Sequence, residues 1–109
     1  MADIRNQLEA MCDSIAEDLR ECDAYGESFG DDILDIEVHG YYASDGEFMR
    51  KHVEITLTIG GPNIFADVYP DGGLVVRGYW GSDTVTRGGR ASDSLVDVCD
   101  QITDARVTA

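Results

Sequence analysis

Acidic side chains recur at helical spacing in two segments near the two ends of the chain. Carboxylates three or four residues apart lie on one side of an α-helix, where they can form ion pairs with basic groups of a partner. Neighbouring like charges also destabilise a helix by about 0.2–0.5 kcal/mol per pair, so each stripe has an energetic cost. The two stripes consist of Glu9, Asp13, Glu17 and Glu21, and of Asp93, Asp97, Asp100 and Asp104.

The overall charge restricts the kinds of partner that the chain can bind. The 109 residues include 22 acidic and 8 basic side chains, which give a formal net charge of −14. Such a chain repels nucleic acid and anionic membranes and attracts a basic protein surface. Two simpler interpretations of the acidity are solubility and adaptation to a salt-rich cytoplasm. The excess of Asp over Glu and the single lysine, Lys51, fit salt adaptation, whereas the content of Arg and Ile does not argue for it.

The two histidines, His39 and His52, suggest a second kind of chemistry. Both lie in segments with the alternation of β-strands, and a hairpin could bring them together. Glu37 or Glu54 could then join them as ligands of a metal ion, since imidazole and carboxylate groups are common zinc ligands. The alternative is that both histidines are exposed strand side chains without a ligand.

Other chemistry has little support in the sequence. Cys12 and Cys22 lie on one predicted helix, about 15 Å apart along its axis, which is too far for a disulfide bond. With Cys99 they form an odd number, and no C-x-x-C spacing occurs, so we expect three reduced thiols. The H-E-x-x-H, G-x-S-x-G and phosphate-binding glycine motifs are absent. We therefore expect neither an enzyme nor a cofactor.

Apolar periodicity predicts a helix at each end of the chain. Residues 3–23 carry an apolar face at a spacing of three or four residues, and a polar connection with glycine follows at residues 24–32. A second helix begins after Ser92 or Asp93, either of which could cap it. Its buried face is expected to contain Leu95, Val98, Cys99, Ile102 and Ala105.

Between the helices the apolar period changes to two. Strands are expected from Ile33 to about residue 41, and at residues 52–59, 64–69 and 74–80. The turn signals Asp-Gly, Gly-Gly-Pro-Asn and Pro-Asp-Gly-Gly separate them. Residues 81–90 are expected to form a loop, in which Thr84–Thr86 could be a short edge strand.

These elements predict an α+β fold of a single domain, residues 1–109. Short turns between neighbouring strands favour a four-stranded antiparallel meander. Both helices are amphipathic, and one face of the sheet is strongly apolar. We therefore expect a two-layer arrangement with the N- and C-terminal helices on that face. The opposite face would be solvated or would bind a partner.

The segment from residue 53 to residue 81 has a distinctive order of features: an apolar strand, GGPN, a β-hairpin and GYWG. Turn chemistry explains the glycines and prolines before the GYWG sequence. The whole pattern resembles short acidic proteins of bacterial phages and mobile elements. Such proteins include anti-CRISPR inhibitors, several of which resemble nucleic acid in charge and occupy the nucleic-acid channel of a Cas complex. The resemblance covers about a quarter of the chain and implies a class of function without assigning residues.

Charge and resemblance together predict a non-enzymatic inhibitor that imitates nucleic acid. One helical stripe places a carboxylate every ~6 Å, about half the charge density of one DNA strand, which has a phosphate every ~3.4 Å. The predicted partner is a basic nucleic-acid-binding host defence protein, most specifically a CRISPR effector. The predicted interface joins both stripes to four further acids, Asp31, Asp32, Asp35 and Glu37, and to three aromatic anchors, Tyr41, Tyr79 and Trp80.

Two alternatives remain open. The chain could be a protein–protein interaction or assembly module of a phage or mobile element, acting through the sheet face or as a homodimer. It could also be a small metal-binding protein that uses His39 and His52. Under each hypothesis we expect a location in the host cytoplasm, because neither a secretory signal nor a long apolar segment is evident.

Overall fold

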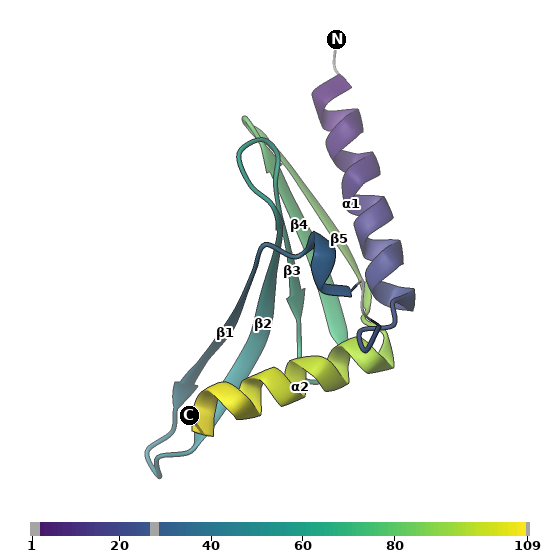
Figure 1. Cartoon of the computed structure of the whole chain (residues 1–109). Helices are drawn as coiled ribbons and strands as arrows, with labels where there is room; N and C mark the ends of the chain where they lie inside the picture. The colour runs from purple at the N-terminus through teal and green to yellow at the C-terminus, as the bar shows by residue number, and fades with distance from the viewer. Residues whose placement is uncertain (1–2, 27–28, 109) are drawn as a thin grey trace.

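The computed structural model of the chain describes residues 3–26 and 29–108, without the side chains of Asp3, Phe29, Asp32 and Thr108. It confirms the predicted α+β fold, with a layer of two helices against an antiparallel sheet (Figure 1). Neither helix is long and apolar enough to cross a membrane. In chain order the elements are α1 (Asp3–Glu21), the 3-10 turn η1 (Phe29–Asp32), β1 (Asp35–Tyr42), β2 (Phe48–Thr58), β3 (Asn63–Val68), β4 (Gly73–Trp80), β5 (Asp83–Arg90) and α2 (Asp93–Thr108).

The sheet has five strands in the order β1-β2-β3-β4-β5, so the predicted number of four was wrong. The segment expected to be a loop with a possible short edge strand at Thr84–Thr86 is a full strand, β5, which pairs with β4 from Asp83 to Arg90. Gly88 and Gly89 weakened the local strand signal, because glycine has low β-propensity. Pairing with the free edge of β4 outweighs that propensity. Helix α1 packs on β5, and Val85 of this strand is only 2% exposed.

A single core lies between the helices and one face of the sheet. Its members come from both helices and from β2 to β5. Helix α1 lies along β4 and β5, where Leu8 and Cys12 rest on Gly78. A Cβ atom at position 78 would lie 2.6 Å from the Cys12 Sγ, so glycine is required for this close approach. The buried side chains of the core include Leu8, Cys12, Val53, Ile55, Ile64, Val68, Leu74, Val76, Leu95 and Cys99.

Helix α2 is fastened at both ends. The Ser92 hydroxyl accepts a hydrogen bond from the Leu95 amide at 3.2 Å, so Ser92 is the N-cap. In the middle of the helix, Arg50 of β2 donates to the Cys99 carbonyl (3.2 Å) and to the Thr103 hydroxyl (2.9 Å). Near its C-terminus, Arg106 donates to the Ile36 carbonyl of β1 at 2.7 Å. These bonds hold α2 across the β1–β2 end of the sheet (Figure 1).

The buried thiol of Cys99 makes the fold sensitive to alkali. Burial raises the pKa of this thiol from its ordinary value of 9.0 to about 11, although the nearby Arg50 acts in the opposite direction. In the unfolded chain the thiol ionises at lower pH than in the folded one. The free energy of unfolding is therefore expected to fall by about 2–3 kcal/mol between pH 9 and pH 11 from this group. In urea titrations a Cys99→Ala variant should lose less stability over that range than the wild type, and an equal loss would contradict this assignment.

Candidate functional site

The face of the sheet away from the helices, here called the open face, carries polar side chains. Strand pairing places Glu37 opposite Glu54 and His39 opposite His52. The next pair of strands places Glu54 opposite Asp67. Because strand side chains alternate between faces, all of these groups point away from the core. The cross-strand register thus brings together groups that are separated by up to 30 positions in the chain.

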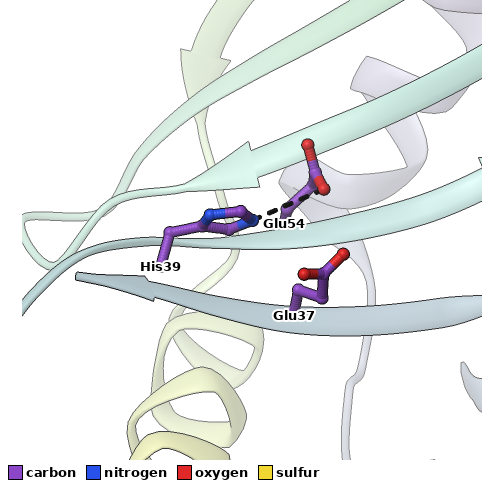
Figure 2. Close-up of side chains that lie close together, drawn as sticks. All are labelled: Glu37, His39 and Glu54. Carbon is purple, nitrogen blue, oxygen red and sulfur yellow. Dashed lines mark ion pairs between the residues drawn. The ribbon is translucent and has the colours of Figure 1, made fainter.

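Three of these side chains form a compact cluster of metal-ligand type (Figure 2). The donor atoms of Glu37, His39 and Glu54 lie within 4.8 Å of one another. The His39 Nε2 lies 3.5 Å from the Glu54 Oε1. The Nε2 atom is covered and has no hydrogen-bond partner among the residues that the structure describes, although the imidazole side chain as a whole is 40% exposed. The cluster therefore combines two carboxylates with a buried imidazole nitrogen whose polar capacity is unused.

The two histidines stack on each other across the strands. Their ring centroids lie 4.8 Å apart with an angle of 16° between the planes. The register shifts beside His39, so that Lys51 of β2 is an extra residue without a β1 partner. This bulge turns Arg50 towards α2 while His52 stays on the open face, although the two residues would share a face in a regular strand. His52 then lies 3.6 Å from the Asp67 carboxylate.

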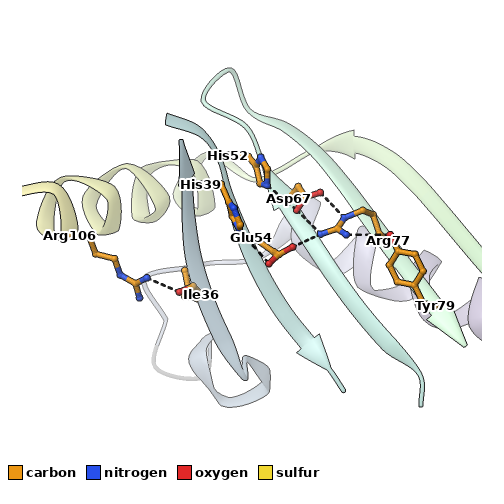
Figure 3. Close-up of polar contacts among 8 residues, drawn as sticks. All are labelled: Ile36, His39, His52, Glu54, Asp67, Arg77, Tyr79 and Arg106. Carbon is orange, nitrogen blue, oxygen red and sulfur yellow. Dashed lines mark hydrogen bonds and ion pairs between the residues drawn. The ribbon is translucent and has the colours of Figure 1, made fainter. Parts of the chain in front are cut away.

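Arg77 of β4 joins the carboxylates of the open face (Figure 3). Its Nε and Nη2 donate to the two oxygens of Asp67 at 2.7 and 3.0 Å, and Nη2 also donates to the Glu54 Oε2 at 2.6 Å. The guanidinium lies 5.1 Å from the centre of the Phe65 ring and donates to the Tyr79 hydroxyl at 3.3 Å. The Asp67 side chain is only 7% exposed and that of Arg77 is 26% exposed.

These contacts stabilise the charged form of Arg77. Burial by itself lowers the pKa of the guanidinium, but the hydrogen bonds to Asp67, Tyr79 and Glu54 outweigh it and raise the pKa above its ordinary value. Arg77 and Asp67 thus form an ion pair with two parallel hydrogen bonds, and the same guanidinium holds one oxygen of Glu54. Asp67 and Arg77 were not among the predicted site residues. The available signal was one charged residue in each of two otherwise apolar strands, which usually requires a partner.

The structure gives the predicted stripe of α1 an internal partner. Arg87 of β5 donates to Asp13 at 2.6 Å and to Glu9 at 3.2 Å. Hydrogen bonding to Asp13 raises the pKa of this guanidinium, against a smaller effect of burial. The remaining members of the stripe, Glu17 and Glu21, are exposed and form no ion pair within the described part of the chain. Half of this stripe thus contributes to helix–sheet packing.

Acids of the α2 stripe also make contacts within the molecule. Asp100 pairs with Arg50 at 2.7 Å. Asp97 accepts hydrogen bonds from the Tyr25 hydroxyl and, at 3.2 Å, from Gln101. Asp93 and Asp104 are exposed on the same helix. All four acids lie on the side of α2 away from the buried Leu95 and Cys99, as their spacing predicts.

Two of the other predicted interface acids, Asp35 and Glu37, lie on the side of the sheet opposite to the stripes. Asp31 is exposed in η1, and the side chain of Asp32 lies outside the described residues. Asp35 and Glu37 are exposed on β1 and face the open side of the sheet.

The three predicted aromatic anchors are also separated. Tyr41 is 56% exposed near the end of β1. Tyr79 packs edge-on against Phe65 on the open face. Its neighbour Trp80 is partly buried and packs against the core.

No family model matches the chain, and no curated protein or solved structure is significantly similar to it. The resemblance to phage and mobile-element proteins therefore stays a prediction.

Proposed function

We propose that the chain is a non-enzymatic inhibitor that binds the basic, nucleic-acid-contacting surface of another protein and blocks access of nucleic acid. The binding surface would be the outer side of the helical layer, here called the acidic helix surface. The most specific candidate partner, which the GGPN and GYWG pattern implies, is a CRISPR effector. The acidic helix surface comprises Glu17, Asp18 and Glu21 of α1 and Asp93, Asp97, Asp100 and Asp104 of α2.

One observation supports this proposal above others: both helices cover the same face of the sheet. Their exposed carboxylates therefore belong to the same layer of the molecule, so that one partner surface could contact both helices. Within each helix the acids are spaced by about 6 Å along the axis. The basic groups of the two helices are few: Arg5 is near Asp83, Arg106 is used in the bond to Ile36, and Arg20 packs beside Gly89. The acidic helix surface would attract a cationic channel at long range.

The test neutralises acids that the fold does not use. A triple variant, Glu17→Gln, Glu21→Gln and Asp93→Asn, spares the Arg87 and Arg50 ion pairs. The matched control makes the same change in charge at two turns, with Asp45→Asn, Glu47→Gln and Asp71→Asn. For a panel of purified Cas effectors, target-DNA binding is measured by mobility shift with wild-type protein and with both variants, at low and high salt.

The helix variant is expected to inhibit about tenfold more weakly than the wild type, because each exposed charge pair contributes on the order of 0.5 kcal/mol. The turn control should inhibit like the wild type, and inhibition by the wild type should weaken steeply with salt. Equal weakening by both variants would show that net charge matters and the helix surface does not. If a Tyr41→Ala variant instead abolishes binding while the helix variant does not, the chain is an interaction module without mimicry.

A further inference from the structure

The geometry points to a zinc-binding site on the open face of the sheet, formed by Glu37, His39 and Glu54. It lies on the opposite side of the sheet from the acidic helix surface and does not depend on the proposed function. The three donor atoms lie within 4.8 Å of one another and come from two adjacent strands (Figure 2). In the register of β1 and β2, Glu37 lies opposite Glu54, and His39 lies two residues further along β1.

The buried nitrogen of His39 is an independent indication of a ligand. Nearly all buried polar atoms in folded proteins have a hydrogen-bond partner, and an unpaired one costs about 1–3 kcal/mol. The His39 Nε2 has no such partner within the described residues, although a carboxylate oxygen lies 3.5 Å away. A cation between that nitrogen and that oxygen would satisfy both groups. Stacking on His52 keeps the imidazole ring in place.

The surrounding residues hold Glu54 in one orientation. They act as an outer shell, which is the set of residues that hydrogen-bond to the ligands of a metal without binding the metal. Arg77 holds the Glu54 Oε2 at 2.6 Å, which leaves Oε1, the oxygen nearest His39, free to bind a metal. Asp67 in turn fixes Arg77 with two hydrogen bonds (Figure 3). Hydrogen-bonded partners of this kind commonly fix the carboxylates of metal sites. His52 lies beside Asp67, so we assign it to this outer shell, whereas the sequence analysis paired it with His39 as a ligand.

The donor set restricts the metal to divalent ions that accept both nitrogen and oxygen ligands, and Zn²⁺ is the one to be tested. One imidazole and two carboxylates suit Zn²⁺, which binds nitrogen and oxygen ligands at about 2.0–2.2 Å. Ligand atoms of one tetrahedral zinc are roughly 3.4 Å apart at such bond lengths, so donor atoms that now lie up to 4.8 Å apart must approach by up to about 1.4 Å. Glu37 is exposed and flexible enough to supply that movement. Three protein ligands leave one coordination position for water or another small ligand.

The experiment is a zinc titration of metal-free protein at pH 7.5 with a non-thiol reductant, followed by calorimetry. We expect one zinc ion per chain, and Co²⁺ in its place should show no thiolate absorption band. His39→Gln and Glu37→Gln should each weaken zinc binding by more than about tenfold. Loss of a residue that only hydrogen-bonds to a metal ligand already weakens metal binding by about tenfold or more. Two matched controls, Glu47→Gln and Cys22→Ser, should bind zinc like the wild type. Circular dichroism of each variant establishes that it is folded.

Every other outcome overturns the site. Absence of zinc binding by the wild type excludes it directly. Equal weakening by Glu37→Gln and Glu47→Gln would show non-specific attraction to an acidic protein, and weakening by Cys22→Ser would place the metal on a thiol. If His52→Gln weakens binding as strongly as His39→Gln while Glu37→Gln has no effect, a two-histidine site replaces the one inferred. None of these results bears on the acidic helix surface.

Discussion

An Arg77→Met variant is expected to lose about 3–5 kcal/mol of unfolding free energy at neutral pH, the largest effect of any exchange of a polar side chain on the open face. Methionine keeps an unbranched apolar side chain beside Phe65 but removes the guanidinium contact with that ring and every hydrogen bond to Asp67 and Glu54. Asp67 would then be a buried carboxylate, 7% exposed, and the His52 imidazole would be the basic side chain left beside it among the described residues. Most of the loss in unfolding free energy comes from the uncompensated charge of Asp67, and less of it from the lost hydrogen bonds.

Two further variants separate this explanation from a general sensitivity to arginine loss. Arg87→Met removes ion pairs to Glu9 and Asp13, whose side chains are 36% and 60% exposed, and should cost less than about 1 kcal/mol. The double variant Arg77→Met with Asp67→Leu should regain much of the stability lost by Arg77→Met, because no buried charge remains. Urea unfolding, followed by far-UV circular dichroism, measures all three. Equal losses for the two arginine variants, or no recovery in the double variant, would contradict the buried-charge explanation.

A Gly78→Val variant is expected to lose about 2–3 kcal/mol, the second largest effect. The new Cβ would lie 2.6 Å from the Cys12 Sγ and 2.8 Å from the Leu8 Cδ1, so α1 would have to move away from β4. Overpacking of this kind costs about 1–3 kcal/mol, and valine's higher β-propensity compensates only in part. Urea titration measures the stability, and fluorescence of the only tryptophan, Trp80 in the same strand, reports on local repacking.

The matched control for this exchange is Gly88→Val on β5. A Cβ there would have only the Leu74 carbonyl oxygen within 4 Å, at 3.9 Å. The same valine is therefore expected to leave stability unchanged within about 0.5 kcal/mol or to raise it slightly. A loss at Gly88 as large as that at Gly78 would mean that backbone freedom of glycine, and not contact with α1, determines the effect.

Much of the fold was predictable because its signals are local. Leu8, Cys12 and Leu19 recur at helical spacing, and the alternation around Val53 and Ile55 marks a strand with one buried face. The extent of β5 was underestimated for the opposite reason. The sequence predicts only a possible edge strand at Thr84–Thr86, because Gly88 and Gly89 carry little strand signal, and β5 exists because β4 and α1 cover it. Its stability comes from contacts with distant segments, which local propensity does not contain.

The candidate sites follow the same division. The sequence by itself determined which residues carry charge, which helix side each acid occupies, and that Glu37, His39 and Glu54 belong to strands. Only the tertiary structure decided which charges neutralise one another. Arg87 pairs with Asp13, which is 74 positions away in the chain, and Arg77 pairs with Asp67 on the neighbouring strand. The bulge at Lys51 likewise decided that His52 faces Asp67 while Arg50 turns to α2. The physical reason is that residue type and periodicity are properties of neighbouring residues, whereas pairing distances depend on strand register and helix docking.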